Sequence, residues 1–519
     1  MCYCIPQPIG EAVMRGGKRK GAGRNALLPC EKKQGHTIYL TDEQCDAVMN
    51  IAEGETFSEK CSFIIDRFMV HLYIPGEAQK TVRIIDLFAG LGGIRLGFEK
   101  AFQHLGYSVD CVFSSEIKPY AVKAYKQFFK DRLVHGDITT IPSADIPDFD
   151  FLLAGFPCQP FSSAGKGLGF DDTRGTLFFE IERILKAKRP IGFLLENVEG
   201  LVTHDHGRTL DIILRRLRKM GYHVSWKLLN SQDFGLAQKR NRVYIVGMRS
   251  GEVPLTGFQP MRATFGDIQQ LDLPCVNSDF TKKVLSAYTP EQLAGKAIRD
   301  KRGGTSNIHS WDIGLKGSVS SLQKQLLNTI LTKRRMRKWA DEIGIDWMDG
   351  MPLTASQIAS FFPVENLQAL LDDLVAKGYL TFEHPRARVN RARVPDETKP
   401  KGYNIVAGKL SFEFTKILSP SECVPTLVAM DVSHLGVVDG KGIRRLSIRE
   451  GLRLFGYPES YSLSFLKDAE AFDLLGNTVC VPVIQAIAKR LAQAFIPSQV
   501  RYPVMRPLLA QSQRTAQCV

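Results

Sequence analysis

Cys158 is the side chain of this sequence with the clearest capacity for chemistry. It lies in the segment GFPCQPFS, residues 155–162, which directly follows the apolar run FLLA at residues 151–154. The run predicts a buried strand, and α/β sheets place ligands and reactive groups at the carboxyl ends of their strands. As a thiolate, Cys158 would be a nucleophile. Because most cysteines are small buried hydrophobic residues, the neighbouring motifs must decide between these two interpretations.

Charged side chains also stand next to predicted strands elsewhere in the chain. Glu196 comes directly after the apolar run 193–195, and Arg240 and Arg242 come just before the run 243–248. A glutamate in that place either caps a helix or exchanges a proton with a ligand. Arg240 and Arg242 are two residues apart, so strand geometry predicts that both point to the same face.

A glycine-rich turn, DLFAGLGG at residues 86–93, joins a predicted strand to a predicted helix. Glycines at such a turn let the backbone approach a ligand closely, but the spacing is neither GxGxxG nor a P-loop. Glu116 follows the next strand, where an acidic residue takes ribose hydroxyls, and Asp137 and Ile138 stand in a later turn. These residues describe an adenosine site without a pyrophosphate cradle, which fits S-adenosylmethionine better than NAD.

The elements that must position these residues alternate between strand and helix from residue 81 to residue 249. The expected fold class is therefore α/β, a doubly wound, Rossmann-like parallel sheet. Two later apolar runs predict an antiparallel pair at its edge, and residues 481–495 predict another helix of this domain. The runs that predict these elements are 82–87, 109–114, 151–154 and 193–195 for strands, 120–130 and 176–187 for helices, and 224–229 and 243–248 for the edge pair.

Changes of pattern divide the rest of the chain. The divisions that we expect are a flexible basic arm (1–35), a small α+β module (36–75), a first catalytic part (81–249), an inserted target-recognition domain (250–440), a returning catalytic part (441–495) and a tail (496–519). The insert carries basic clusters at 333–338 and 386–393. Within it, residues 353–384 have the helix, helix, turn and strand order of a winged helix. A solvated charged face is the alternative interpretation of the basic clusters.

The module at residues 36–75 has its own pattern. Residues 36–40 alternate like a strand, and two capping-box spacings open short helices after it. This order resembles a ribbon-helix-helix module, which dimerises and lays a two-stranded ribbon in the DNA major groove. We expect Thr37 and Tyr39 to face the DNA. A small helical extension packed on the main domain is the alternative.

Composition limits the classes of function. The chain has 519 residues and a formal net charge of +14, which favours a polyanionic partner. No run approaches the ~18 apolar residues of a membrane span and no signal-peptide core is present, so we expect a cytoplasmic protein without a membrane partner. The 11 cysteines include no CxxC pair, so the pattern indicates neither a zinc site nor a disulfide framework.

Five segments occur in the order typical of C5-cytosine DNA methyltransferases, and the chain resembles this family over residues 81–249 and 441–495. The segments are residues 86–93, 155–162, 196–198, 238–242 and 476–479. The resemblance implies that S-adenosylmethionine is the methyl donor and that Cys158 adds to C6 of a flipped cytosine. It also implies that Glu196 holds and protonates N3, while Arg240 and Arg242 orient Glu196 and contact the base.

The resemblance assigns further contacts position by position. The cofactor contacts that it implies are Phe88, Gly90, Gly93, Glu116, Asp137, Ile138, Pro157, Asn477 and Val479. The DNA contacts that it implies are Gln159, Ser162 and Thr426. Thr478 stands where many relatives have serine, which retains the hydroxyl. Residues 162–166 are the expected loop that closes behind the flipped base.

Other functions stay open at the level of sequence. A tRNA cytosine C5 methyltransferase uses the same scaffold, although its relatives have a smaller insert. The N-terminal module could also repress a promoter, including its own, whereas the intact Cys158 and Glu196 disfavour a catalytically inactive relative. Residues 307–312 and 347–352 resemble those of enzymes that act on GGNCC or GG(A/T)CC. We expect a catalytic domain that is monomeric on duplex DNA. Dimerisation through the N-terminal module and a cognate restriction endonuclease for the same site remain open.

Overall fold

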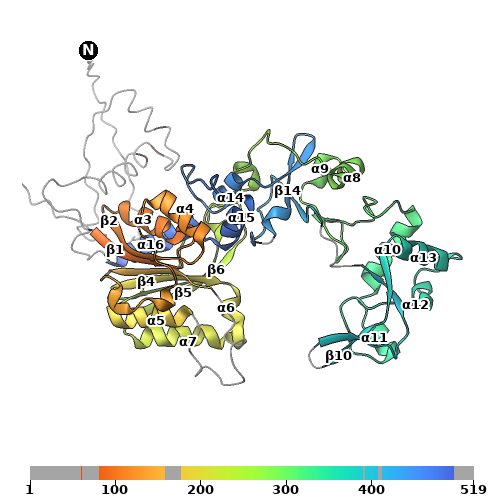
Figure 1. Ribbon diagram of the computed structural model, residues 1–519, viewed down its shortest axis with the longest axis horizontal. Helices are drawn as coiled ribbons and strands as arrows, with labels where there is room; N and C mark the ends of the chain where they lie inside the picture. Colours follow the sequence, from red (N-terminus) through yellow and green to blue (C-terminus); the bar gives the residue numbers. More distant parts are fainter. Residues whose placement is uncertain are drawn as a thin grey trace, which may run out of the picture. The chain divides into compact units, whose positions relative to one another are not determined.

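Figure 1 shows the computed structural model of the chain, which divides into two compact units, Met1–Leu72 and Tyr73–Val519. The structure describes residues 81–131, 133–157, 177–389, 392–406, 412–429 and 431–495, together with Met49, Thr56 and Lys60. The predictions for the basic arm, for Thr37 and Tyr39 and for the tail therefore lie outside the described residues.

A six-stranded sheet forms the centre of the second unit, in the order β2-β1-β3-β4-β6-β5. Its first four strands are parallel, and β6 runs antiparallel to both of its neighbours. The predicted α/β class is confirmed, and so is the antiparallel pair, which β5 and β6 form at one edge of the sheet. Of this pair, β5 is the edge strand and β6 lies between β4 and β5. The strands are β1 (Thr81–Leu87), β2 (Ser108–Ser115), β3 (Phe151–Gly155), β4 (Gly192–Val198), β5 (His223–Asn230) and β6 (Asn241–Met248).

Helices cover both faces of this sheet, which explains why its strands are continuous apolar runs. Along β1, Val82 and Ile84 pack into one core, whereas Ile85 and Leu87 pack into the other. Helices α3 and α16 belong to the first core, and α5 and α7 lie on the opposite face (Figure 1). The helices around the sheet are α3 (Gly93–Gln103), α4 (Pro119–Phe129), α5 (Leu177–Lys188), α6 (Gly200–Thr203), α7 (Arg208–Lys219) and α16 (Val481–Phe495).

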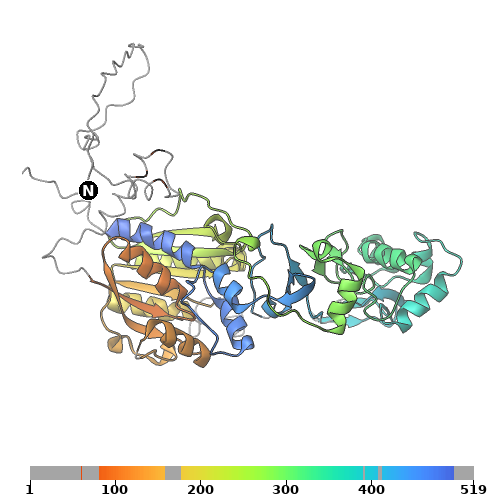
Figure 2. The ribbon, with the colours of Figure 1, turned by 90° about the horizontal axis from the view of Figure 1, so that it is seen from above.

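The C-terminal helix α16 returns to the first half of the sheet and lies alongside α3 (Figure 2). A Cβ atom added to Gly97 of α3 would stand 2.7 Å from Cβ of Ile484, so the absence of a side chain permits this close approach. Among the described residues, one stretch, Asp468–Phe495, is long and apolar enough to span a membrane. Within that stretch, α15 (Asp468–Asn477) and α16 are separate helices, and most of its apolar part is buried, so it belongs to the protein core.

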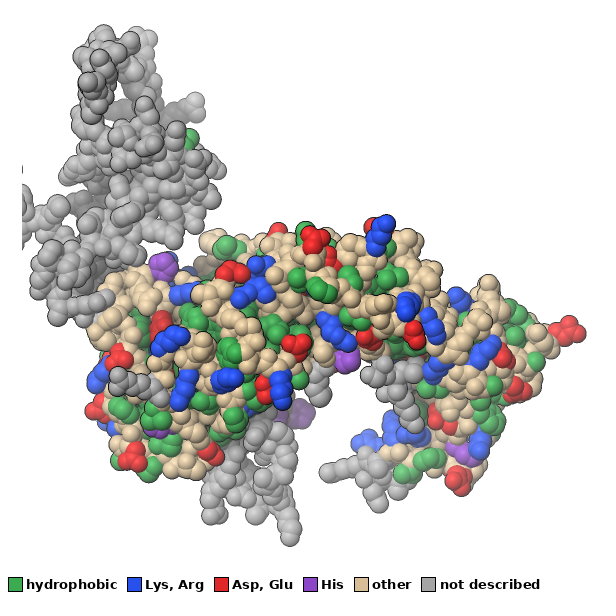
Figure 3. Space-filling model, turned by 45° about the horizontal axis from the view of Figure 1, so that its top comes forward, with side chains coloured by type: hydrophobic (Ala, Val, Ile, Leu, Met, Phe, Trp, Pro, Cys, Tyr) green, Lys and Arg blue, Asp and Glu red, His purple; other side chains and the backbone are tan. Residues whose placement is uncertain are grey.

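The residues between β6 and α14 (Ile448–Leu454) form a second sheet and a helical module with its own core. The second sheet has the order β15-β14-β13-β7-β8, and the module packs around α10 and α13. Lys and Arg side chains are interspersed with Asp and Glu on the face seen in Figure 3. The sheet strands are β7 (Ala297–Ile298), β8 (Asn307–Ile308), β13 (Lys416–Leu418), β14 (Leu435–Asp439) and β15 (Gly442–Arg445), and the helices next to them are α8 (Asp279–Ala287) and α9 (Pro290–Leu293). The module consists of α10 (Ser321–Lys333), α11 (Lys338–Ile343), α12 (Ala355–Ala359), α13 (Leu367–Ala376), β9 (Leu380–Glu383), β10 (Arg386–Val389), β11 (Ala392–Pro395) and β12 (Gly402–Ile405).

Candidate active site

Glu196 lies near the carboxyl end of β4, beside Gly155 at the end of β3. The residue is 8% exposed, and its Oε1 atom pairs with Nε of Arg242 at 3.1 Å. Arg242 comes from β6, which runs antiparallel to β4, so adjacent strands bring the two charges together. The sequence predicted this pairing, and the register of β4 and β6 gives its geometric reason.

The surroundings of Glu196 shift its titration. Burial raises the pKa of its carboxyl group, while the positive charges of Arg242 and Arg240 act in the opposite direction. The net shift is upward, because the loss of hydration outweighs the two arginines. A carboxyl group with a raised pKa is suited to give a proton to a ligand and to take it back.

Arg240 has different hydrogen-bond partners from Arg242. It lies directly before β6, which begins at Asn241, so its orientation to the same face as Arg242 stays a prediction. Its buried guanidinium group donates to the carbonyl oxygens of Leu427, Gly476 and Thr478, at 2.9, 3.1 and 2.9 Å. Arg240 therefore fastens two distant segments together, and reaches Glu196 through its charge alone.

The segment that leads to Cys158 begins beside this pair. A Cβ atom added to Gly155 would lie 3.6 Å from Oε2 of Glu196, so the backbone passes close to the carboxylate. The side chain of Asn197 donates to the carbonyl oxygen of Phe156 at 3.0 Å, which anchors the start of the segment to β4. Pro157 follows and is exposed. The predicted Cys158, Gln159 and Ser162 lie outside the described residues.

The glycine-rich turn lies at the carboxyl end of β1. Phe88 and Gly90 both have positive φ angles, of 56° and 52°, and the backbone N–H of Gly90 donates to Oε2 of Glu116 at 2.8 Å. Gly93 begins α3, where an added Cβ atom would lie 2.6 Å from the Tyr457 hydroxyl oxygen and 2.8 Å from Cγ2 of Val479. The structure thus brings these three residues of the turn together with Glu116 and Val479.

The returning C-terminal segment is tied to the other side of this turn. Asp473 of α15 accepts hydrogen bonds from Nζ of Lys118 and from the hydroxyl of Tyr120, both at 2.7 Å. The side-chain amide of Asn477 donates to the carbonyl oxygen of Asp473 at 2.8 Å. Lys118 is two residues after Glu116, so these bonds hold Asn477 near the carboxyl end of β2.

Asp137 and Ile138 stand beside the end of β2. His135 forms a bridge with Ser115, and the N–H of Glu116 donates to the carbonyl oxygen of His135 at 2.9 Å. Asp137 is exposed and accepts hydrogen bonds from the N–H and hydroxyl of Thr139. The Ile138 side chain is buried in the core that also contains Ile85 and Leu87. Of this pair, the Asp137 carboxylate is the side chain that can meet a ligand.

The edge formed by Gly90, Glu116 and Asp137 fits a nucleoside by the chemistry of its groups. The two carboxylates accept hydrogen bonds, and the hydroxyl groups of a ribose and the amino group of an adenine donate them. No atom lies within 4 Å of a Cβ atom added to Gly136, so the backbone between the carboxylates is open. These residues could therefore hold the nucleoside part of a cofactor.

Thr426 contacts the segment before β6. Its hydroxyl donates to the carbonyl oxygen of Lys239 at 2.6 Å, and the next residue, Leu427, accepts from Arg240. The fully buried Gln238 donates to the carbonyl oxygen of Leu454 at 3.2 Å and accepts from the N–H of Leu427 at 3.4 Å. Thr426 is thus placed next to the Glu196–Arg242 pair through one short segment.

Four positioning residues were not predicted individually from the sequence: Asn197, Gln238, Tyr457 and Asp473. Asn197 and Gln238 lie inside motifs whose neighbours were singled out, and an amide next to a catalytic candidate is the available signal. Tyr457 and Asp473 act through partners more than 300 residues away in sequence, at Gly93 and Lys118. No local pattern indicates such contacts.

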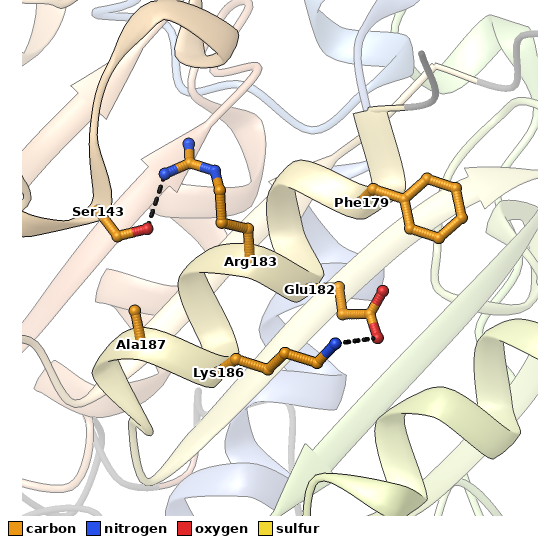
Figure 4. A pocket seen from close by; sticks show the side chains of 6 residues that line it. All are labelled: Ser143, Phe179, Glu182, Arg183, Lys186 and Ala187. Carbon is orange, nitrogen blue, oxygen red and sulfur yellow. Dashed lines mark hydrogen bonds and ion pairs between the residues drawn. The ribbon is translucent and has the colours of Figure 1, made fainter. Parts of the chain in front are cut away.

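A shallow hollow lies elsewhere, on α5 (Figure 4). Its charged side chains pair with one another or with neighbours, since Arg183 donates to the hydroxyl of Ser143 and Lys186 pairs with Glu182 at 2.9 Å. None of the predicted site residues lines it. The candidate active site is therefore the edge of the sheet described above.

Fold and site together define the class of the protein, an α/β enzyme with a Rossmann-like methyltransferase fold. The model of the C-5 cytosine-specific DNA methylases matches residues 82–493. The Type II methyltransferase M.NlaIV of Neisseria lactamica is 55% identical over 79% of this chain and 99% of its own length. M.HgiCI of Herpetosiphon aurantiacus, also a Type II methyltransferase, is 43% identical over 78% of this chain and 96% of its own length.

A crystal structure of a Spodoptera frugiperda DNMT2 mutant aligns with a TM-score of 0.43 and 16% identity, over 79% of this chain and 99% of that one. The match to the family model and the high identity to the Type II methyltransferases decide the assignment. The chain belongs to the C-5 cytosine-specific DNA methylase family and is a DNA (cytosine-5-)-methyltransferase.

Proposed function

We propose that this enzyme methylates C5 of a flipped cytosine in duplex DNA, with S-adenosylmethionine as donor and a transient bond between Cys158 and C6. The observation that carries the proposal is the buried Glu196–Arg242 pair, which lies beside the backbone leading to Cys158. C5 of cytosine is a poor nucleophile, so the ring must first gain electron density. A thiolate and a proton donor on the same base supply that activation.

The residues act in a defined order in this proposal. The Cys158 thiolate forms a bond to C6 while Glu196 gives a proton to N3, which makes C5 nucleophilic. S-adenosylmethionine, when bound, supplies the methyl group as an electrophile. A base then takes the C5 proton, the Cys158–C6 bond breaks, and the N3 proton returns to Glu196. Arg242 holds the Glu196 carboxyl group in position throughout, at 3.1 Å.

The sheet edge formed by Gly90, Glu116 and Asp137 would hold the methyl donor. In this proposal Glu116 accepts from the ribose hydroxyls and Asp137 from the adenine amino group, while Phe88, Gly90 and Gly93 surround the ligand. The backbone of Ile138 completes the contacts, together with Pro157, Asn477 and Val479. Support comes from the carboxylates at the sheet edge and from the bonds that hold Asn477 close to it.

Thr426, Gln159 and Ser162 would contact the DNA around the extruded base. Thr426 is exposed and its hydroxyl is fixed by Lys239, directly before the arginines of the site. Extruding a base costs a few kcal/mol. Residues are therefore required that hold the extruded nucleotide and occupy the space that it leaves in the duplex. A polyanionic substrate also agrees with the formal net charge of +14.

Trapping on duplex DNA that contains 5-fluorocytosine tests the mechanism. The C5 fluorine cannot leave as a proton does, so the proposed Cys158–C6 bond should persist and produce a protein–DNA complex stable in denaturing gels. Cys158→Ser should lose both the complex and methyl transfer. Cys275→Ser, which changes an exposed cysteine in the insert, should retain both. Covalent capture by the Cys158→Ser protein would contradict the proposal.

The substrate is tested by offering duplex DNA and tRNA to the same enzyme with labelled donor. We expect transfer to DNA and none to tRNA, and a preference for tRNA would favour the alternative function. Bisulfite sequencing of DNA from a host that expresses the enzyme then identifies the methylated recognition sequence. The similarity to Type II methyltransferases supports a restriction endonuclease that acts on the same sequence, and an enzyme that works on DNA in the bacterial cytoplasm.

We also propose that residues 36–75 bind DNA as a dimeric ribbon-helix-helix module, through Thr37 and Tyr39, next to the basic arm 1–35, and repress a promoter. The family model starts at residue 82, and residues 15–24 are rich in Arg and Lys, which supports a separate task for this part of the chain. Deleting residues 1–75 should abolish promoter binding and leave methyl transfer intact. Unchanged promoter binding and expression would contradict this proposal.

A further inference from the structure

The module from α10 to β12 has the connectivity of a winged helix. Its order is α10, the short helix α11, a single strand residue at Leu353, α12, α13, β9, the hairpin β10–β11 and finally β12. Leu353 and Tyr403 of β12 exchange backbone hydrogen bonds of 3.0 and 2.7 Å, and β12 pairs antiparallel with β9. One apolar core joins the three helices to this small sheet. The hairpin is therefore the wing, defined here as the strands Arg386–Val389 and Ala392–Pro395.

The register of the wing gathers arginines on one face. Arg388 stands directly opposite Arg393, and Arg386 is two residues before Arg388, so all three share a face. Ala387 and Val394 form the opposite face. Like charges directly opposite each other destabilise an antiparallel pair. Among the described residues, no carboxylate lies within ion-pairing distance of these three exposed guanidinium groups.

The helix that would read the major groove in a helix-turn-helix protein has the opposite character. Helix α13, LQALLDDLVA, contains no Lys or Arg. On its exposed side Gln368 donates to Asp372 at 2.8 Å, and the half-buried Asp373 pairs with Lys377 at 2.6 Å and accepts from Gln323 of α10. A groove lined by phosphates would repel these carboxylates. The charge of the module thus directs the wing, and not α13, to DNA.

The other basic cluster of the insert is partly structural. Arg334 is 4% exposed, and its guanidinium group donates to the side-chain oxygen of Asn404 on β12 at 2.5 Å. Arg337 is exposed but lies 3.8 Å from Asp341 of its own helix. Lys338 and Lys401 of this module are also exposed and without an ion pair among the described residues, but the arginines of the wing are three such cations on one face.

We propose that the wing binds the phosphate backbone of duplex DNA through Arg386, Arg388 and Arg393, while α13 faces away from the groove. This rests on the proposed function insofar as the DNA is the substrate of the enzyme. Backbone contacts position a protein without reading sequence. The wing would then supply affinity for DNA and position the protein on the duplex, and other residues of the insert would read the recognition sequence.

The test is the salt dependence of binding to duplex DNA, measured with the full chain in the absence of methyl donor. Arg388→Ala/Arg393→Ala should reduce the slope of log Kd against log salt by about two, or about one for each arginine that no longer meets a phosphate. Affinity at moderate salt should fall at least about tenfold, equally for DNA with and without the target word. Methyl transfer at saturating DNA should keep its kcat.

Three controls make the result decisive. Arg215→Ala removes an exposed arginine on α7 and should leave the slope unchanged, and Arg388→Lys/Arg393→Lys should restore it. Ala369→Glu adds a charge to the exposed side of α13 and should not weaken binding. An unchanged slope for the double alanine variant, a loss confined to the target word, or a large loss from Ala369→Glu would overturn the proposal.

The outcome is separable from that of the proposed function. A protein that binds DNA with a wing-dependent slope but transfers no methyl group would contradict the catalytic proposal and support this one. If the protein methylates DNA but the wing substitutions leave the slope of log Kd against log salt unchanged, the catalytic proposal is supported and this one is contradicted. Thermal unfolding of each variant shows whether the module is intact, since the substitutions lie on an exposed hairpin.

Discussion

Nε of Arg242 lies 3.1 Å from Oε1 of Glu196, and the two residues come from adjacent strands that run in opposite directions. The pairing depends on β6 lying next to β4 instead of at the edge of the sheet. Both side chains are nearly buried, so the ion pair is protected from screening by salt. This pair controls how readily Glu196 holds a proton.

Arg242→Gln should raise the pKa of Glu196 further, because burial already raises it and Arg242 opposes that rise. If transfer requires protonated Glu196, the rate falls as pH rises through this pKa, and the variant should move that fall to higher pH. Single-turnover rates across pH measure the shift, together with a loss of about 10²-fold from the misplaced acid. Glu196→Gln should show no such pH limb. An unmoved limb in Arg242→Gln would contradict the assignment.

Gly93→Ala should destabilise the protein, because its Cβ atom would lie 2.6 Å from the Tyr457 hydroxyl oxygen and 2.8 Å from Cγ2 of Val479. Overpacking of this kind costs about 1–3 kcal/mol. Gly136→Ala, which meets no atom within 4 Å, should be nearly neutral. Denaturant unfolding measures the wild-type protein and the two variants. Equal losses from Gly93→Ala and Gly136→Ala would contradict the packing argument.

Asp86 should make stability fall as pH rises. Burial raises the pKa of this carboxyl group to about 8, although Arg95 and the Tyr125 hydroxyl act to lower it. In the unfolded chain the group ionises near pH ~4, so between about pH 4 and 8 the folded state holds a proton that the unfolded state has lost. The contribution of protonated Asp86 to the free energy of unfolding is fully present below pH ~4. It is lost as the pH rises towards 8, by up to about 1.4 kcal/mol per pH unit.

Asp86→Asn should remove this dependence, because the amide does not titrate and its oxygen can still accept from Tyr125, as the carboxylate does at 3.0 Å. Unfolding free energies at several pH values between 5 and 8 measure the difference between the two proteins. Comparing the two cancels the titration of the remaining groups. Parallel curves for wild type and variant would show that Asp86 does not carry the effect.

The fold was largely predictable from sequence, since the strands of the main sheet are apolar runs and its helices are amphipathic. The periodicity of β1 is one example, because Ile84 and Ile85 enter different cores. The partners of Arg240 could not be predicted from two-residue alternation, because its guanidinium group donates to carbonyl oxygens of segments that are distant in sequence. Tyr457 and Asp473 could not be predicted, because their partners are set by how the C-terminal segment returns to the sheet.

Arg240→Lys should impair both DNA binding and donor binding, because Arg240 joins two segments that have separate tasks in the proposed function. Its guanidinium group donates to Leu427, next to Thr426, and to Gly476 and Thr478, on either side of Asn477. Burial lowers the pKa of Arg240 to about 10, so it keeps its charge at neutral pH. A lysine is a point charge that cannot reproduce the planar arrangement of donors. Each buried carbonyl left unpaired costs about 1–3 kcal/mol.

We therefore expect the KM values for donor and for DNA to rise together in Arg240→Lys, with a lower unfolding temperature. Thr426→Ala is the matched comparison, since it removes one exposed hydroxyl and leaves the three carbonyl bonds in place. It should weaken DNA binding and leave donor binding unchanged. Steady-state kinetics with each substrate varied separately distinguish the two patterns. If Arg240→Lys changed the KM for only one substrate, the segments at Leu427 and Thr478 would be positioned independently, and Arg240 would not be their common anchor.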